Sequence, residues 1–420
     1  MEIKKYKLAD IGKVITGKTP STSIAENYAC GTIPFYTPED VAKGLGMMGR
    51  NNRFITQTGF EEIVSNTITG ESVLVGCIGS DMGNVAYSNV TCATNQQINS
   101  ITQFINGVEP LYVYYLLSTM KPYFQKIAGS TTTPILPKSV FEEIEIHLPD
   151  IKIQKDVVSI LYALDHKIEL NKQINDNLEA MAKQLYDYWF VQFDFPNEEG
   201  KPYKSSGGAM VWNEKLKREI PSCFEVVNMG KLCDFRNGIN YSKDETGNDY
   251  QIVNVRNISS SRILLDGEDF DVITVPTSKA ENYVLKPDDI IIARSGCPGS
   301  TRLLLSPANT LFCGFIICCS PNDSSMRNYL VYCLKQLEGT NATTSGGSIL
   351  QNVSQDTLKG LHVIVPEKQI IDKFNKTIEL TFARMLNCLK ESKALTKQRD
   401  ELLPLLINGQ ASVNYHLSDD

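Results

Sequence analysis

Two long stretches of the chain place residues of one face at alternating steps of four and three, which is the heptad pattern of a packed α-helix. The second stretch repeats the first at an offset of 217 positions, residue for residue. At about 1.5 Å per residue, a stretch of roughly 40 residues would form a helix near 60 Å long. The first set is Val157, Leu161, Leu164, Ile168, Asn171, Asn175, Leu178, Ala182, Leu185 and Trp189, and the second is Phe374, Ile378, Thr381, Met385, Cys388, Ser392, Leu395, Arg399, Leu402 and Leu406.

Neither helix would be stable alone in water, so each needs a partner, and pairing of the two with each other in antiparallel orientation is the simplest arrangement. Polar residues interrupt both patterns near their middles, at Asn171 and Asn175 and at Ser392 and Arg399. Such residues lower stability but can fix the register of a helix pair. The alternative is that they are exposed where the helices splay apart.

The same offset relates the segments that precede the helices. Residues 73–75 (VLV) fall on residues 290–292 (III), and Tyr112 falls on Tyr329. Near the start of each segment the match slips by one, so that residues 11–14 (IGKV) fall on residues 229–232 (MGKL). A repeat of this length indicates a duplicated domain, not a solenoid.

Each repeat begins with short β-like runs, continues with a helical segment and ends in a strand at Pro149 or Pro366. We therefore expect a mixed α/β (α+β) fold, in which two similar globular domains are separated by a pair of long antiparallel coiled-coil helices with pseudo-twofold internal duplication. The predicted boundaries are residues 1–150 for the first domain, 151–195 for the central helix, 196–225 for a crossing, 226–366 for the second domain, 367–410 for the second helix and 411–420 for a tail.

Composition and charge narrow the functional classes. The net charge is −7, and the eleven cysteines follow no repeating spacing, which is typical of reduced thiols in a cytoplasmic protein. No apolar run is long enough for a membrane span. Residues 1–150 carry 11 basic and 14 acidic side chains, and residues 226–365 carry 12 and 14, so neither domain is basic overall.

One motif has the form of a phosphate-binding loop, because residues 12–19 (GKVITGKT) match G-x-x-x-x-G-K-[ST]. That loop must lead directly into a helix, but residues 20–23 (PSTS) follow and have no helical period. A turn after a strand explains the motif better than nucleotide binding does. The four histidines are scattered and no Cys-x-x-Cys is present, so we expect a chain that is not an enzyme.

The chain resembles the specificity subunit of type I restriction–modification enzymes. The resemblance rests on residues 189–196 (WFVQFDFP) with 200–208 (GKPYKSSGG), and on residues 402–410 (LLPLLINGQ). A proline followed within a few residues by a glutamine precedes or begins each predicted long helix, at Pro149 and Gln154 and at Pro366 and Gln369. This feature also resembles the family.

The resemblance implies a non-catalytic subunit with two target-recognition domains that bind double-stranded DNA. Each domain would read one half of a bipartite target, and the helical pair would set the unread spacer. Because the two domains differ in their loops, we expect an asymmetric target. The implied partners are modification (methyltransferase) subunits, two of them, and restriction (endonuclease/translocase) subunits. No cofactor is expected on this chain, because S-adenosylmethionine and ATP would bind the partners. The expected location is cytoplasmic.

Candidate DNA contacts follow from base-edge chemistry, in which Arg pairs with guanine and Asn or Gln pairs with adenine. Because neither domain is basic, we expect local patches to read bases while partners contact the backbone. The candidates are Lys18, Arg50, Asn51, Arg53, Gln96, Gln97, Thr131 and Thr132 in the first domain, and Arg236, Asn240, Asn254, Arg256, Arg294, Ser345 and Ser348 in the second.

The aromatic residues Tyr186, Tyr188, Trp189 and Phe190 are candidates for a partner interface, and the competing interpretation is that they complete the core where the helix meets the crossing. One alternative function is a non-catalytic, duplicated coiled-coil scaffold that binds protein, which the acidic charge favours.

Overall fold

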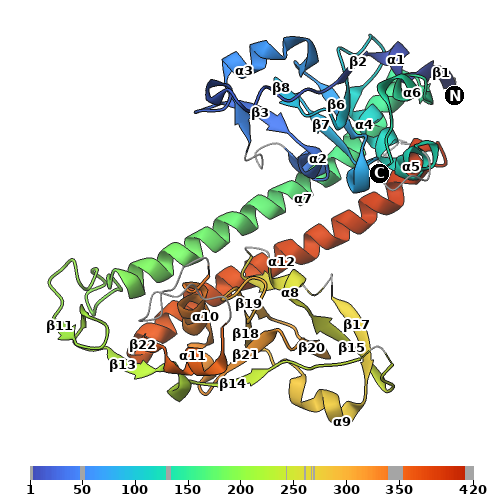
Figure 1. The fold of residues 1–420 in the computed structure, drawn as a ribbon. Coiled ribbons are helices and arrows are strands. Elements are labelled where there is room, and N and C mark those ends of the chain that lie inside the picture. Colours follow the sequence, from blue (N-terminus) through green and yellow to red (C-terminus); the bar gives the residue numbers. More distant parts are fainter. Residues whose placement is uncertain are drawn as a thin grey trace, which may run out of the picture. The chain divides into compact units, whose positions relative to one another are not determined.

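A computed structural model of the chain describes residues 3–47, 53–128, 134–242, 244–259, 262–265, 267, 270–338 and 353–411. The chain forms two compact units (Figure 1). Unit 1 comprises Met1–Leu170 and Ser392–Asp420, and unit 2 comprises Asn171–Glu391. The limits between the two units fall within the long helices, after Leu170 and after Glu391. The boundaries predicted from the sequence treat each long helix as a separate segment, so this division does not test them and they stay a prediction.

Unit 1 contains two four-stranded sheets and a separate pair of strands. The first sheet has the order β2-β9-β6-β7, and the second has the order β4-β3-β8-β5, in which β3 and β8 run parallel. The strands are β1 (Ile3–Lys7), β2 (Lys13–Thr16), β3 (Ile33–Tyr36), β4 (Phe54–Ile55), β5 (Thr67–Ile68), β6 (Ser72–Gly76), β7 (Val85–Ser88), β8 (Cys92–Thr94), β9 (Ile98–Thr102) and β10 (Glu145–Pro149). The helices are α1 (Leu8–Ile11), α2 (Pro38–Val41), α3 (Gln57–Glu62), α4 (Pro110–Thr119), α5 (Lys121–Ile127) and α6 (Lys138–Glu142).

Unit 2 has a similar topology, but its two sheets have five and three strands, in the orders β14-β21-β18-β19-β16 and β17-β15-β20. Strands β15 and β20 run parallel, as β3 and β8 do. The strands are β13 (Glu225–Asn228), β14 (Cys233–Asn237), β15 (Asn248–Val253), β16 (Leu264–Leu265), β17 (Asp271–Val275), β18 (Ile290–Ala293), β19 (Thr301–Leu304), β20 (Thr310–Phe312), β21 (Ile316–Pro321) and β22 (His362–Val365). The helices are α8 (Val255–Ile258), α9 (Thr277–Ala280), α10 (Arg327–Lys335) and α11 (Gln355–Gly360).

The shared topology confirms the internal duplication, but one detail of the sequence alignment is wrong. The backbone N–H of Leu8 donates to Ile144 O at 3.0 Å, and that of Met229 donates to Leu361 O at 2.8 Å. Leu8 is therefore the structural equivalent of Met229, whereas the sequence match placed Ile11 there. The short Gly-Lys match misled the alignment because hydrogen bonding to the exit strand, not residue identity, fixes this segment.

Both predicted long helices are present, as α7 (Ile151–Tyr186) and α12 (Lys368–Ile407). A single π turn (Asp187–Val191) follows α7. Every residue of the two heptad sets is buried or half-buried. In unit 1, Asp165 pairs with Arg399 while Leu161 shares a core with Leu406, so the two helices run antiparallel. In the described part of the chain, no helix is apolar enough over a sufficient length to cross a bilayer.

Two of the four polar interruptions, Arg399 and Asn171, make hydrogen bonds between the helices. In unit 1, Arg399 donates to Asp165 Oδ1 at 2.7 Å, and the Tyr115 hydroxyl donates to Asp165 Oδ2 at 2.8 Å. In unit 2, Asn171, which is 1% exposed, donates to Glu391 at 2.8 Å. Register fixing, and not splaying, is therefore the role that fits Arg399 and Asn171.

The crossing is ordered and forms part of unit 2. It contains a hairpin of β11 (Met210–Asn213) and β12 (Arg218–Pro221), which the sequence did not predict. Phe193 and Phe195 are buried in the core of the unit, and the Asp194 side chain accepts hydrogen bonds from the Ser205 N–H and hydroxyl at 2.7 and 2.6 Å. These contacts explain why the WFVQFDFP segment folds back instead of extending.

Candidate nucleic-acid interface

Gly17 brings the end of β2 against the turn between β8 and β9. Its N–H donates to Ile98 O at 3.1 Å. A Cβ at this position would lie 2.1 Å from Thr94 Oγ1 and 2.3 Å from Asn95 O, so only glycine fits. The motif at residues 12–19 is therefore strand β2 with its exit, and the next helical turn after the motif begins only at Ala25.

This close approach gathers three predicted DNA contacts at one end of the sheet. Lys18 is exposed, and the Thr19 hydroxyl donates to Gln96 Oε1 at 2.9 Å. The backbone carbonyl of Gln97 accepts a hydrogen bond from Cys77 N, which follows β6, at 2.8 Å. We call Lys18, Thr19, Gln96 and Gln97 the turn edge of unit 1.

A pocket of about 500 Å³ lies beside this edge and contains the fourth described candidate of the unit, Arg53. Thr19 belongs to both the pocket and the turn edge, so Arg53 is close to the other candidates. Tyr28, Phe35 and Phe54 supply aromatic walls. Aromatic and arginine groups together suit contact with base faces and thymine methyl groups.

Unit 2 repeats the arrangement around Gly238. Its N–H donates to Ile316 O at 3.1 Å, and a Cβ there would lie 2.1 Å from Cys313 O. Asn240 follows and is exposed. Arg294, directly after β18, donates its backbone N–H to Phe315 O at 2.8 Å.

The Arg294 side chain is exposed and makes no ion pair with any residue that the structure describes. Asn240, Arg294, Gly314 and Phe315 form the turn edge of unit 2.

Asn254 and Arg256 reach the same end of unit 2, because Cys313 N donates to Val253 O at 3.0 Å. Asn254 is the N-cap residue of α8, and its Nδ2 donates to Asp271 Oδ2 at 2.8 Å. Arg256 pairs with the same carboxylate and remains 62% exposed. Because an exposed ion pair contributes little, the guanidinium could exchange Asp271 for a phosphate at small cost.

Arg236 lies among packing residues and not at the turn edge. Its guanidinium donates to Asp289 Oδ2 at 2.6 Å and to Val284 O at 3.1 Å, and lies over the Phe312 ring at 5.5 Å. These contacts occupy donors that a DNA contact would need. These contacts could not be predicted from the sequence, because the acidic partner is 53 residues away along the chain.

Two exposed aromatic residues, one in the turn edge of unit 2 and one close to it in the sequence, were not predicted as DNA contacts. Phe315, the equivalent of Gln97, is 63% exposed, and Tyr241 is 38% exposed. Aligning the two turns through Gly17 and Gly238 is the signal that could have found Phe315. The remaining candidates, Arg50, Asn51, Thr131, Thr132, Ser345 and Ser348, lie outside the described residues.

Three of the four aromatic interface candidates are buried in the core of unit 2. Tyr186 is 4% exposed, Trp189 is 9% and Phe190 is 4%, and all three pack within 6.4 Å, by ring centroids, of Phe374 on α12. Burial raises the pKa of the Tyr186 hydroxyl well above its ordinary value. This is the packing role that the sequence left open. Tyr188 is 39% exposed, and its interface role stays a prediction.

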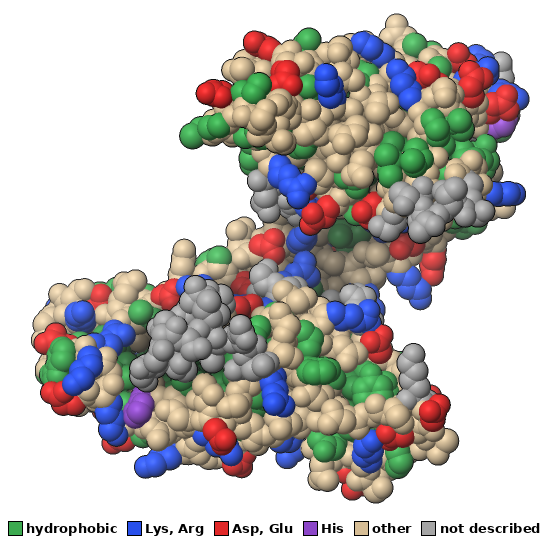
Figure 2. Space-filling model, in the orientation of Figure 1, with side chains coloured by type: hydrophobic (Ala, Val, Ile, Leu, Met, Phe, Trp, Pro, Cys, Tyr) green, Lys and Arg blue, Asp and Glu red, His purple; other side chains and the backbone are tan. Residues whose placement is uncertain are grey.

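The charged side chains on the surface show no basic excess, as expected from the composition of the two domains. On the face drawn in Figure 2, lysine and arginine side chains are interspersed with aspartate and glutamate and do not gather in one broad patch. Each turn edge therefore offers a few hydrogen-bonding groups on a rigid backbone frame. Such a frame suits base readout more than general attraction to phosphate.

Comparison with known proteins identifies the class. A family model described as "Type I restriction modification DNA specificity domain" matches residues 1–180 and 221–391. The chain belongs to this family, and it is a specificity subunit of a type I restriction–modification system.

Several relatives carry the same description. The chain is 29% identical to the type I restriction enzyme MjaIX specificity subunit of Methanocaldococcus jannaschii, over 98% of this chain and 94% of that protein. It is 25% identical to the HindI specificity subunit of Haemophilus influenzae, over 73% and 78% of the two chains. The fold is similar to the crystal structure of the type I restriction-modification S subunit from M. genitalium, with a TM-score of 0.57, 16% identity and coverage of 97% and 96%.

Proposed function

We propose that each of the two domains reads one half of a bipartite, asymmetric DNA target through its turn edge. The supporting observation is that the two edges share a backbone frame and differ in side chains. Gly17 and Gly238 make equivalent hydrogen bonds, at 3.1 Å in each case. On this frame, Gln97 of one unit corresponds to Phe315 of the other. Because the frame is shared and the reading groups differ, the half-sites differ in sequence.

The contacts that we assign to each half follow from side-chain chemistry. In unit 1, Gln96 and Gln97 present amides suited to adenine, and Lys18 and Arg53 can contact guanine or phosphate. In unit 2, Arg294 is suited to guanine, Asn240 to adenine and Phe315 to a thymine methyl group.

Other subunits supply the chemistry in this proposal. The chain is a non-catalytic component that binds no cofactor and docks two modification subunits and restriction subunits, which hold S-adenosylmethionine and ATP. The family assignment supports this division, and so does the acidic balance of both domains. Phosphate neutralisation usually supplies much of DNA affinity, so most of it would come from the partners. A cytoplasmic location stays a prediction.

The long helices have a proposed role in setting the spacer. α7 and α12 each contribute residues to both units. Two half-sites on one face of B-DNA lie about one helical turn, roughly 34 Å, apart or slightly more. The hydrogen bonds that fix helix register would then also fix the number of unread base pairs.

The test is to sequence methylated sites in DNA treated with the complex of this chain and its modification subunit. The Arg294→Ala variant should relax selectivity at a position in one half-site, with a loss of about 1–3 kcal/mol for the preferred base. The Lys18→Ala variant should affect only the other half-site, so each variant is the control for the other.

A perfectly palindromic target would contradict the proposal, as would a loss of both half-sites from one substitution. A complex that assembles but methylates without sequence preference would favour the protein-binding scaffold instead.

A further inference from the structure

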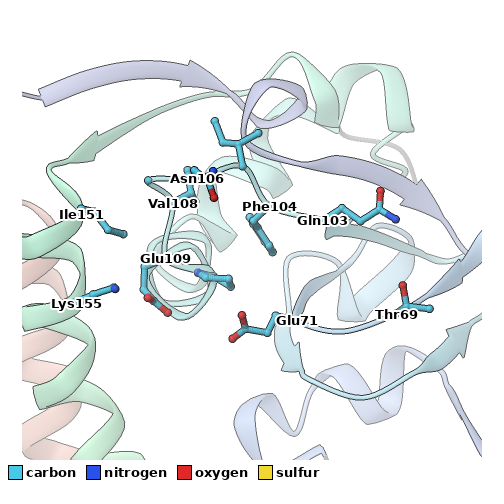
Figure 3. A pocket seen from close by; sticks show the side chains of 12 residues that line it. Thr69, Glu71, Gln103, Phe104, Asn106, Val108, Glu109, Ile151 and Lys155 are labelled. Atoms are coloured by element: carbon cyan, nitrogen blue, oxygen red, sulfur yellow. The ribbon is translucent and has the colours of Figure 1, made fainter.

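Unit 1 has an acidic pocket at the end of its first sheet opposite to the turn edge. Strand β9 begins next to Gln97 at the turn edge and ends next to Gln103, which lines this pocket. The pocket has a volume of about 410 Å³. Four of the residues that line it are Glu71, just before β6; Phe104, after β9; Glu109, just before α4; and Lys155, near the start of α7 (Figure 3).

The pocket contains two carboxyl groups and a single lysine, so its lining carries an excess of negative charge. In Figure 3, the side chains of Glu71 and Glu109 point toward the same space beside Phe104. Glu71 accepts a hydrogen bond from the Tyr87 hydroxyl at 2.6 Å. Burial raises the pKa of Glu109 and the charge of Glu71 raises it further, while a backbone hydrogen bond from Leu111 and the charge of Lys155 offset part of this rise. Among the described residues, none forms an ion pair with either carboxylate, although Lys155 also lines the pocket and its charge acts on Glu109.

The duplicated unit shows how the same place is filled by a cation. Asp288 lies before β18 as Glu71 lies before β6, and Arg327 is the first residue of α10 as Pro110 is the first residue of α4. The Arg327 guanidinium lies 3.7 Å from Asp288 Oδ1 and 3.4 Å from Pro287 O, and its side chain is only 16% exposed. Unit 2 therefore supplies its own arginine. Proline at the equivalent position of unit 1 cannot do so, and the pocket is open there.

The charge of the pocket excludes DNA as its occupant. Two carboxylates repel phosphates, and the turn edge lies at the other end of the same sheet. A basic protein side chain has the complementary charge, and the Phe104 ring offers a face for a guanidinium or for the apolar stem of a lysine.

We propose that the acidic pocket of unit 1 binds an arginine or lysine side chain of the modification subunit, in the place that Arg327 occupies in unit 2. The modification subunit is named as the partner on the basis of the proposed function. The positive charge of the bound side chain is inferred from the acidic lining of the pocket.

The test measures the affinity of the full chain for the purified modification subunit without DNA. The double variant Glu71→Gln, Glu109→Gln keeps the shape of the pocket and removes both charges. We expect its affinity to fall at least tenfold, with a weaker dependence on salt than that of the wild type. The matched control is Asp288→Asn, which alters the equivalent site that Arg327 already fills and should leave the affinity unchanged. An affinity of the double variant within twofold of the wild type would overturn the proposal.

A second measurement does not depend on the stability of the double variant. A photo-reactive residue in place of Ile105, which lines the pocket and is 44% exposed, should cross-link to a basic segment of the modification subunit. Absence of that cross-link in an assembled complex would refute the pocket as a docking site.

The two proposals fail in different ways. If the wild-type complex assembles and methylates without sequence preference, the proposed function is wrong. If it reads its target normally and the double variant assembles as well as the wild type, only the pocket inference is wrong.

Discussion

The buried ion pair between Arg302 and Glu338 gives a sharp test of what stabilises unit 2. Arg302 is fully buried on β19, and its guanidinium donates to both carboxylate oxygens of Glu338, at 2.9 and 2.7 Å. The same group also donates to Thr301 O at 2.7 Å. Lys335 lies 3.2 Å from Glu338 and 3.6 Å from Glu179. The change Glu338→Gln removes the charge that faces the arginine and retains the side-chain shape.

Removing one partner of a buried ion pair costs about 3–5 kcal/mol, because the other charge stays buried without compensation. The Glu338 side chain is 25% exposed, so water can partly solvate the vacated site. We therefore expect a loss near the lower end, about 3 kcal/mol. The double change Arg302→Met, Glu338→Leu removes both charges and should recover most of this loss.

Tryptophan fluorescence can follow this unit alone, because both tryptophans of the chain, Trp189 and Trp212, belong to unit 2. Chemical denaturation monitored in this way gives the free energy of unfolding of unit 2 for each variant. The matched control is Glu199→Gln, which breaks an ion pair of 2.9 Å whose side chains are 65% and 70% exposed. Its expected cost is below about 1 kcal/mol.

The effect should depend on pH in a defined direction. Burial by itself would raise the pKa of Glu338, but the hydrogen bonds and charge of Arg302, together with Lys335, hold it below its ordinary value. The pair therefore stabilises unit 2 fully above the ordinary carboxyl pKa of about 4.3 and less as the pH falls through the lowered value. Equal stability of wild type and Glu338→Gln at pH 7 would refute the reasoning.

Two further predictions concern unit 1 and the turn edges. Arg399→Ala leaves Asp165, which is 10% exposed, with the Tyr115 hydroxyl as its one side-chain partner among the described residues, and should cost about 2 kcal/mol in hydrogen-exchange stability of unit 1. Unchanged exchange would mean that the pair contributes nothing. Gly17→Ala and Gly238→Ala place a Cβ 2.1 Å from Thr94 Oγ1 and from the Cys313 carbonyl oxygen, so each should abolish reading of its own half-site in a methylation assay. Normal reading by either variant would show that the close approach is not required.

Much of the architecture was predictable because it depends on local patterns. The heptad spacing gave both long helices, since a helix must bury the face that carries its apolar residues. The repeat at an offset of 217 gave the duplication. The alignment failed at Leu8 and Met229, where hydrogen bonds to Ile144 and Leu361 decide the equivalence.

The candidate site was predictable only in part. Lys18, Gln96, Asn240 and Arg294 were chosen for their chemistry, and the structure places the first two together in unit 1 and the last two together in unit 2. Arg236 was chosen for the same reason, but it pairs with Asp289 inside the unit. Residue type alone could not separate these cases, because an arginine serves equally well in a buried ion pair and in a DNA contact.

By itself, the sequence determined which segments are helical, that the chain is duplicated, and which family it resembles. Tertiary structure alone decided which charges meet. Arg302 with Glu338, Arg399 with Asp165, and Arg327 with Asp288 are all brought together from distant segments. The physical reason is that periodicity is a property of neighbouring residues, whereas electrostatic pairing depends on distances that exist only after the sheets and helices have packed.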